Sequence, residues 1–351
     1  MTPRVSALID TYNHERFVAD AIDSVLAQDF PADEMEILVV DDGSTDRTAE
    51  IVRKFAPRVQ LLQKPNGGQA SAMNFGFAQA KGDLIAFLDG DDVWLPNKLS
   101  RVVAEFESHP EAVMVYHQFS FWDSRSGREW DAGWTMVSGD VVADRRKLHG
   151  YGAVPTSSLA FRRAALERIM PIPEALVFMA DAFLIATVIF LGPVSAISEC
   201  LAKNRVHGEN LWFAETGKPD AKVLRRRIEV REAAIQGIRE WLAKNAPPSA
   251  RSEVLYFLRR WRAIQDADQF QLQAPGRLQR FVHLCRQALI DQPAYSFTWN
   301  VYAWLHAFAF LVAGQSAHRL EALPSQVGRI KRRLQGRVAG KPGGEIAGRS
   351  L

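Results

Sequence analysis

Only two of the 351 residues are cysteines, Cys200 and Cys285. So few cysteines give no disulfide framework, and they suit a protein of a reducing compartment. The first residues, MTPRVSALID, also lack the charged region, long apolar core and small-residue cleavage site of a signal peptide. We therefore expect a cytoplasmic protein without a disulfide scaffold.

Long hydrophobic runs are lacking as well. The apolar stretch at residues 297–313 is interrupted by Asn300 and His306, whereas a membrane-spanning helix needs about 20 predominantly apolar residues. The expected structure there is a buried helix or a helix that lies on a membrane surface.

The net charge is small, +3 at pH 7, and gives no ground to expect a nucleic-acid partner. No G-x-G-x-x-G follows the first apolar run, and G-x-x-x-x-G-K-[ST] is absent from the sequence. The sequence therefore lacks the central features of dinucleotide-dependent oxidoreductases and of P-loop phosphotransferases.

Apolar residues make up 47% of the whole sequence, and in the first part of the chain short apolar runs alternate with helical patterns. This alternation predicts an α/β fold with a mostly parallel sheet that helices cover on both faces. A helix that is apolar all round, and hence buried, is expected at residues 182–191. The expected strands are residues 5–9, 37–40, 59–62, 84–88 and 113–116, and the expected helices between them are residues 17–26, 45–55, 70–80 and 98–106.

The chain is longer than one ordinary core needs, and its character changes after about Asn210. Long helical patterns with basic clusters at residues 225–227 and 329–333 follow, and the last residues are rich in glycine. We expect a catalytic domain at residues 1–213, a helical region at residues 214–335 and a disordered tail at residues 336–351.

Polar clusters stand where three of the expected strands end, at residues 10–13, 41–44 and 89–92. In parallel sheets, ligands bind beyond the carboxyl ends of the strands. If the sheet is parallel, these clusters meet at one crevice.

The third cluster, in FLDGDD, places Asp89, Asp91 and Asp92 directly after an apolar run. In an extended segment the side chains of Asp89 and Asp91 lie on the same side, and two convergent carboxylates suit a hard divalent cation. The alternative is an acidic loop in front of a helix that starts at Pro96.

The second cluster, DDGS, has two interpretations. Ser44 is a candidate N-cap for the following helix, with Asp46 in the first turn. Asp42 could instead face the crevice and accept hydrogen bonds from a nucleobase, on which Tyr12 could stack. Alternatively, Tyr12 is a strand-end aromatic residue that covers the sheet.

Taken together, these motifs resemble the inverting glycosyltransferases of family 2, which have the GT-A fold. The resemblance covers roughly residues 4–210 and rests on the order of four segments. They are VSALIDTYNHERFVADAIDSVLAQDF, EILVVDDGSTDRT, PNGGQASAMNFGFAQAKGDLIAFLDGDD and NRVHGENL.

The resemblance implies a role for each polar cluster. Thr11 and Tyr12, with Asp42 or its neighbour Asp41, would hold the nucleobase side of a nucleotide-sugar. Asp89 would lie near the ribose.

The metal site follows from the same resemblance. Asp91 would bind a divalent metal, Mn²⁺ or Mg²⁺, and Asp92 is the alternative ligand. His207 would close over the metal or diphosphate, and Arg205 would neutralise phosphate charge.

Two departures from the family pattern stand out. The family often has proline where this sequence has Asp10, and it often has Glu-Asp as a catalytic pair where this sequence has Ala180-Asp181. The expected general base is therefore Asp181, and an N-cap of the buried helix is the alternative role for this residue.

The implied function is inverting transfer of a sugar, of the hexosyl type, from a nucleoside-diphosphate sugar to an acceptor hydroxyl. UDP is the favoured carrier, and bacterial cell-surface or extracellular polysaccharide synthesis is the expected setting. A glycan or a lipid-linked molecule would be the acceptor, and the basic clusters suggest peripheral contact with an anionic membrane on the inner face. The alternative is a catalytically degenerate GT-A-like binding or scaffold protein.

Overall fold

The computed structural model describes residues 3–131, 136–144, 147, 148, 151, 154–207, 221–247, 250, 254 and 258. The chain divides into two compact units, Met1–Gln273 and Ala274–Leu351. All described residues belong to the first unit, which carries the candidate site. The expected helix at residues 297–313, the basic cluster at 329–333 and the expected tail lie outside the described residues.

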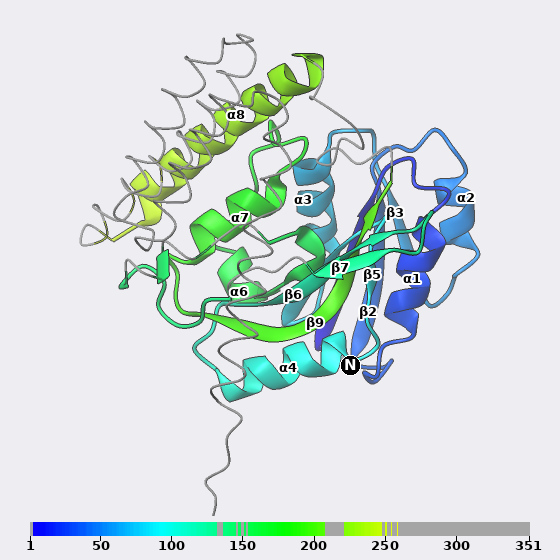
Figure 1. Cartoon of the computed structure of the whole chain (residues 1–351), viewed down its shortest axis with the longest axis horizontal. Coiled ribbons are helices and arrows are strands. Elements are labelled where there is room, and N and C mark those ends of the chain that lie inside the picture. Colours follow the sequence, from blue (N-terminus) through cyan, green and yellow to red (C-terminus); the bar gives the residue numbers. More distant parts are fainter. Residues whose placement is uncertain are drawn as a thin grey trace, which may run out of the picture. The chain divides into compact units, whose positions relative to one another are not determined.

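The first unit is built on one mixed sheet with helices on both faces (Figure 1). Its strands follow the order β3-β2-β1-β4-β8-β6-β9-β5, and β7 pairs with β6. The strands are β1 Val5–Thr11, β2 Met35–Asp41, β3 Gln60–Gln63, β4 Leu84–Asp89, β5 Val93–Trp94, β6 Met114–Asp123, β7 Glu129–Asp131, β8 Leu159–Arg162 and β9 Val194–Val206. The helices are α1 Val18–Leu26, α2 Thr48–Arg53, α3 Gln69–Gln79, α4 Lys98–Ser108, α6 Arg163–Leu166, α7 Ala180–Val188 and α8 Ala221–Asn245, with the 3-10 helix η1 at Thr156–Ser158.

The sheet has a parallel half and a mixed half. From β3 through β2 and β1 to β4 the neighbouring strands are parallel. Beyond β4 the direction alternates, because β8 is antiparallel to both β4 and β6, whereas β9 is parallel to β6. The α/β prediction is confirmed, and the parallel arrangement holds for the first half of the sheet.

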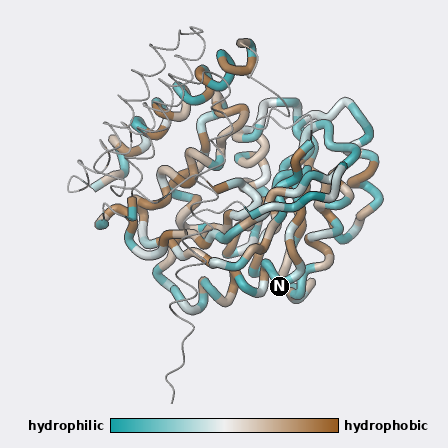
Figure 2. Tube along the Cα trace, viewed as in Figure 1, coloured by the Kyte–Doolittle hydropathy of each residue, from teal (hydrophilic) through white to brown (hydrophobic). Residues whose placement is uncertain are grey.

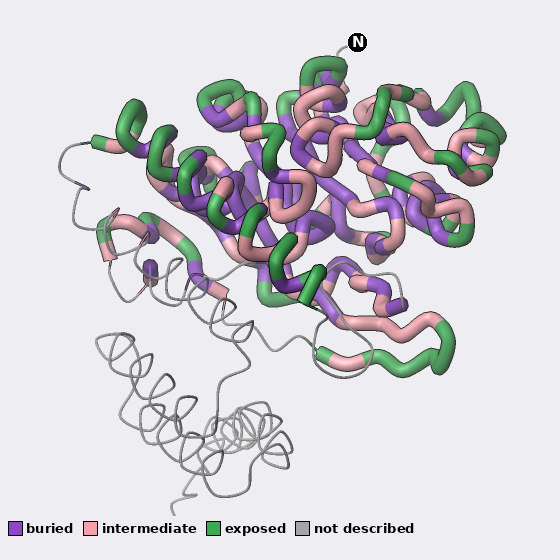
Figure 3. The backbone as a smooth tube through the Cα atoms, turned by 90° about the horizontal axis from the view of Figure 1, so that it is seen from above, coloured by how far each residue is buried: buried purple, intermediate pink, exposed green. Residues whose placement is uncertain are grey.

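Alternation of side chains along the strands divides the core into two layers. On one face of the sheet, Leu8 and Phe87 pack with residues of α3, α7 and α8. On the other face, Ile9 and Leu88 pack with residues of α1 and α4. Buried positions fill the interior between these layers, while exposed positions lie on outer loops and outer helix faces (Figure 3).

Helix α7 is apolar along most of its length (Figure 2) and is buried on all sides, as its composition predicts. It packs against α8, where an added Cβ on Gly237 would lie 2.8 Å from Cγ of Pro173 and 3.4 Å from the Phe183 ring of α7. Trp241 of α8 also donates a hydrogen bond to the Arg168 carbonyl at 3.1 Å. Helix α8 is thus part of the same core, and within the described residues no helix has the length and apolarity to cross a membrane.

Candidate active site

The carboxyl ends of β1, β2 and β4 meet at one edge of the sheet, as the sequence predicts. Thr11 of β1 pairs with Asp41 of β2, and Asp10 pairs with Asp89 of β4. The N–H of Gly90 donates to the Asp10 carbonyl at 2.8 Å, which holds the FLDGDD turn against the end of β1. Three acidic segments that are distant in sequence therefore lie next to one another at this edge of the sheet.

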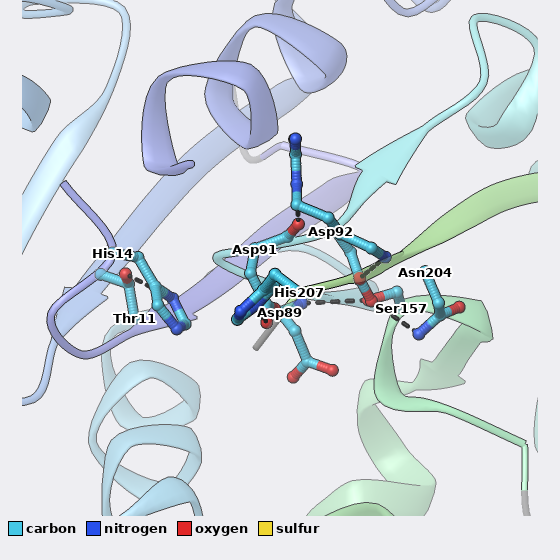
Figure 4. Close-up of polar contacts among 9 residues, drawn as sticks. Thr11, His14, Asp89, Asp91, Asp92, Ser157, Asn204 and His207 are labelled. Atoms are coloured by element: carbon cyan, nitrogen blue, oxygen red, sulfur yellow. Dashed lines mark hydrogen bonds and ion pairs between the residues drawn. The ribbon is translucent and has the colours of Figure 1, made fainter. Parts of the chain in front are cut away.

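Asp91 and His207 face each other across this edge (Figure 4). Nε2 of His207, just after β9, lies 2.9 Å from Oδ2 of Asp91, and the His207 ring packs on Phe17 with ring centroids 4.5 Å apart. Burial alone would raise the pKa of Asp91, but the His207 hydrogen bond and the nearby charges of His14 and His207 leave that pKa below its usual value. Asp91 is consequently the carboxylate of the motif most disposed to stay ionised.

Asp92 turns into the protein and is 3% exposed. Its oxygens accept hydrogen bonds from the Ser157 hydroxyl at 2.6 Å, the Asn204 amide at 2.8 Å and the Arg205 N–H at 2.8 Å. Burial and the charge of Asp91 raise the pKa of Asp92, against the effect of these donors. With both oxygens bonded inside the protein, Asp92 is the less suitable of the two candidate metal ligands.

Arg205 lies behind the acidic turn and is 4% exposed. Its guanidinium donates to the Asp91 carbonyl at 2.7 Å and to the exposed Asp20 carboxylate at 2.8 Å. The rings of Phe17 and Trp122 lie 4.9 and 4.4 Å from the guanidinium carbon. Arg205 therefore fixes the backbone of Asp91, and Phe17 and Trp122 are the aromatic neighbours of this arginine.

Asp42 holds the loop that precedes α3. Its carboxylate accepts from Lys64 at 2.6 Å, from the Gly67 N–H at 3.0 Å and from the Gly68 N–H at 2.6 Å. The neighbouring Asp41 is fully buried and accepts from the Ser44 N–H at 3.0 Å. Both carboxylates are thus buried and accept hydrogen bonds from the backbone of the loops next to the end of β2.

Thr11 is the last residue of β1, and Tyr12 directly follows it. The Tyr12 side chain is 44% exposed, one of two exposed large apolar side chains among the described residues. Thr11 is buried, and its hydroxyl lies 3.3 Å from Nδ1 of His14. A flat exposed ring at a strand end is a suitable stacking surface, so Tyr12 is here an open face and does not cover the sheet.

Ser44 does not cap a helix, contrary to one expectation. Helix α2 begins at Thr48 after Arg47, and the Ser44 hydroxyl instead accepts from the Asn13 N–H at 2.8 Å. Asp46 accepts from the Thr48 N–H at 2.9 Å. The DDGS turn therefore ties the ends of β1 and β2 together, and Asp46 takes the place near the helix start.

Asp181 lies in the first turn of α7, and the N-cap position belongs to Met179. The N-cap alternative for Asp181 is therefore wrong. Oδ1 of Asp181 accepts from the Ala182 N–H at 2.7 Å. Burial raises the pKa of Asp181 to about 6, opposed by hydrogen bonds from backbone N–H groups. A carboxylate with this pKa is well suited to accept a proton near neutral pH.

Two further residues, Asp10 and Gln69, lie at the site although no specific role was predicted for either of them. Oδ1 of Asp10 is buried without a hydrogen-bond partner, and burial together with the charges of Asp91, Asp42 and Asp181 raises the pKa of Asp10 to about 8. Gln69 donates to Oδ1 of Asp89 at 3.2 Å. Burial and the neighbouring carboxylates likewise raise the pKa of Asp89.

A divalent cation fits the donor set at Asp91 and His207. Within the described part of the chain, no group of three or more histidine, cysteine, aspartate or glutamate side chains is arranged around a common metal position. Mg²⁺, however, usually binds through one or two carboxylates and completes its shell with water and substrate phosphates. The partly exposed Asp91 and its imidazole neighbour therefore suit a metal that binds together with a diphosphate.

Comparison with known proteins gives a consistent assignment. The model of glycosyl transferase family 2 matches residues 6–170. An uncharacterized glycosyltransferase of a Nostoc species is 37% identical over 216 residues, which cover 59% of this chain and 66% of that protein. The poly(ribitol-phosphate) beta-N-acetylglucosaminyltransferase TarS of Staphylococcus aureus is 34% identical over 116 residues, which cover 32% of this chain and 20% of TarS. The chain thus spans only part of the length of these relatives.

Solved structures agree on the fold. TarS of Staphylococcus aureus in complex with UDP-GlcNAc superposes with a TM-score of 0.61 at 19% identity, over 91% of this chain and 92% of that one. A mannosyltransferase of Pyrobaculum calidifontis in complex with GDP-Man and Mn²⁺ gives 0.55 at 18% identity, over 97% and 89% of the two chains. These structures show that the chain has the GT-A fold, and the family model identifies its residues 6–170 as a glycosyl transferase family 2 domain.

Proposed function

We propose that this glycosyltransferase transfers a hexosyl group from a nucleoside-diphosphate sugar, with UDP as the favoured carrier, to an acceptor hydroxyl with inversion. The observation that carries the proposal is the meeting of Asp89, the Asp91–His207 pair and Asp181 at one edge of the sheet. The two solved neighbours support it, since one binds UDP-GlcNAc and the other binds GDP-Man with Mn²⁺.

The residues divide into a binding set and a reacting group. Tyr12 and Thr11, with Asp42 or its neighbour Asp41, would hold the nucleobase, and Asp89 would lie near the ribose. Asp42 also holds the loop that precedes α3 through the hydrogen bonds that it accepts from the N–H groups of Gly67 and Gly68. Arg205 acts through the Asp91 carbonyl, which it holds at 2.7 Å.

Asp91 and His207 would hold the divalent metal, Mn²⁺ or Mg²⁺, which when bound neutralises charge on the diphosphate. Asp181 would accept the proton of the acceptor hydroxyl while the hydroxyl oxygen attacks the anomeric carbon. The bond from that carbon to the diphosphate would break, and the nucleoside diphosphate would leave. A single displacement of this kind inverts the anomeric centre. The retained Asp89, Asp91 and Asp181 disfavour the alternative of a non-catalytic binding or scaffold protein.

A glycan or lipid-linked acceptor in polysaccharide synthesis fits the activity of the relative TarS, a poly(ribitol-phosphate) beta-N-acetylglucosaminyltransferase. Peripheral contact with an anionic membrane would bring the site to such an acceptor. Arg225 and Arg226, which are exposed on α8, are the described basic residues that could take part.

A thermal-shift screen of nucleotide-sugars with Mn²⁺ or Mg²⁺ tests the proposed donor. A ligand that binds only the folded state raises the melting temperature. We expect at least one UDP-sugar to stabilise the wild-type protein when metal is present and to lose this effect in Asp91→Asn. The proposal fails if no nucleotide-sugar shifts the transition with either metal, or if Asp91→Asn responds like the wild type.

A further inference from the structure

The N-cap residue of α7 supplies no capping side chain. This residue, Met179, has a left-handed backbone, with φ of 68°, and makes no side-chain cap hydrogen bond. The first N–H groups of a helix need partners from outside it. Here Oε1 of Gln69, which lies 111 positions earlier on α3, accepts from the Ala180 N–H at 3.1 Å. The cap of α7 thus comes from a different helix.

The other end of the same amide reaches the donor side of the site. Nε2 of Gln69 donates to Oδ1 of Asp89 and to the Thr156 hydroxyl, both at 3.2 Å. The orientation of the amide is fixed, because the Ala180 N–H can only donate and must face the oxygen. One side chain therefore joins the end of β4, the 3-10 helix η1 and the first residue of α7.

Helix α3 supports the whole segment that leads into α7. The Gln69 N–H donates to the Val177 carbonyl at 2.9 Å, and an added Cβ on Gly68 would lie 2.5 Å from Cα of Val177. One turn further on, the Asn74 amide both donates to and accepts from the backbone of Ile172, each at 2.8 Å. The start of α3 and the start of α7 are therefore packed in one defined register, and Gln69 is the side chain of this contact that also reaches Asp89.

We propose that Gln69 is a positioning residue that sets the place of the base Asp181 relative to the donor held beside Asp89. This inference rests on the proposed function. Asp181 directly follows Ala180, and its own carboxylate is oriented by the Ala182 N–H of the same first turn. Misplacement of a reacting group by about 1 Å can lower a rate about 100-fold, so loss of the bridge should affect turnover more than folding.

Three substitutions separate the two ends of the amide. Gln69→Glu keeps an acceptor for Ala180 but removes the donor to Asp89 and adds a like charge beside it. Gln69→Lys keeps a donor for Asp89 but removes the acceptor for Ala180, and Gln69→Met removes both. Gln79→Met is the matched control, because Gln79 is exposed at the far end of the same helix.

Two readouts follow each variant. The first is hydrogen–deuterium exchange of the peptide that begins α7, which needs no activity. The second is the turnover number and KM for the nucleotide-sugar that gives the largest thermal shift, followed by release of nucleoside diphosphate with water as acceptor. UDP with Mn²⁺ serves as the binding probe.

The two ends should give different phenotypes. In Gln69→Lys and Gln69→Met, exchange at the start of α7 should become faster and kcat should fall about tenfold or more, with a smaller change in KM. In Gln69→Glu, exchange should stay near the wild-type rate while UDP binding weakens. Gln79→Met should match the wild type in every readout.

Unchanged exchange and a kcat within about twofold of wild type in Gln69→Met would overturn the positioning role. A melting temperature near that of the wild type shows that a variant folds. If Gln69→Met does not fold, the comparison of Gln69→Glu with Gln69→Lys tests the proposal. A further outcome is that the wild-type protein releases no nucleoside diphosphate while the Gln69 variants still show faster hydrogen–deuterium exchange at the start of α7. That result would refute the proposed function, and with it the catalytic part of this inference.

Discussion

The two halves of the sheet contribute different parts of the site. In the parallel half, formed by β3, β2, β1 and β4, the functional side chains follow their strands directly, as Thr11, Asp41 and Asp89 do. In the mixed half, β6 and β9 bring in residues from far along the chain. His207 lies 116 positions from its partner Asp91.

Residues from the mixed half pair with two of the carboxylates that follow β4 of the parallel half. Asp91 is paired with His207, which follows β9, and Asp92 is bonded by Ser157 of η1 and by Asn204 of β9. Burial and neighbouring carboxylates raise the pKa values of Asp89, Asp10 and Asp92, whereas the hydrogen bond from His207 helps to keep the pKa of Asp91 below its usual value. The partners of Asp91 and Asp92 in the acidic turn thus include residues next to or within the strands of the mixed half.

Removal of Asp91 should have the largest effect on activity, because this residue of the parallel half pairs with His207, which follows β9 of the mixed half. Asp91→Ala should keep the fold, since its carboxylate is paired with one histidine only, but should lower metal-dependent turnover by about 10³-fold or more through the lost metal ligand. Turnover with a fixed nucleotide-sugar over a Mn²⁺ titration measures the effect. Full metal-dependent activity in Asp91→Ala would remove this residue from the metal site.

Asp181 separates chemistry from binding. Asp181→Asn should lower the transfer rate by about 10²-fold, the usual scale for a lost general base, and should leave donor affinity unchanged. Titration calorimetry with UDP and Mn²⁺, beside turnover, distinguishes the two effects. Equal losses of affinity and rate would instead indicate that Asp181 takes part in donor binding.

Asp92 should behave as part of the mixed half although it is next to Asp91. Asp92→Asn leaves buried donors such as the Arg205 N–H poorly paired, so the free energy of unfolding should fall by about 2 kcal/mol. Urea denaturation monitored by fluorescence measures this value. Unchanged stability together with lost metal dependence would exchange the roles of Asp91 and Asp92.

Tyr12 should show the smallest effect, confined to the parallel half. Tyr12→Ala should weaken UDP binding roughly tenfold through lost stacking, whereas Tyr12→Phe should bind like the wild type. Because the ring is 44% exposed, neither substitution should change the melting temperature of the free protein. Equal UDP affinity in Tyr12→Ala and the wild type would show that the base binds elsewhere.

The parallel half was predictable from the sequence, and the mixed half largely was not. Thr11, Asp41 and Asp89 could be placed together because parallel strands end at one edge of a sheet. His207 and Arg205 were found only through the order of the family motifs. The partners Ser157 and Gln69 have no local pattern that marks them, because their contacts depend on how η1 and α7 pack against α3 and β4.

The pH dependence of nucleotide-sugar hydrolysis, at saturating donor and under single-turnover conditions, tests the central claim that Asp181 is the base opposite the donor site. Burial raises the pKa of Asp181 to about 6, so below that pH the group is protonated and cannot accept a proton. The wild-type rate should therefore rise through about pH 6 and then level off, and Asp181→Asn should be slow without this rise. A wild-type rate that is constant between about pH 5 and 8, or the same rise in Asp181→Asn, would contradict the account.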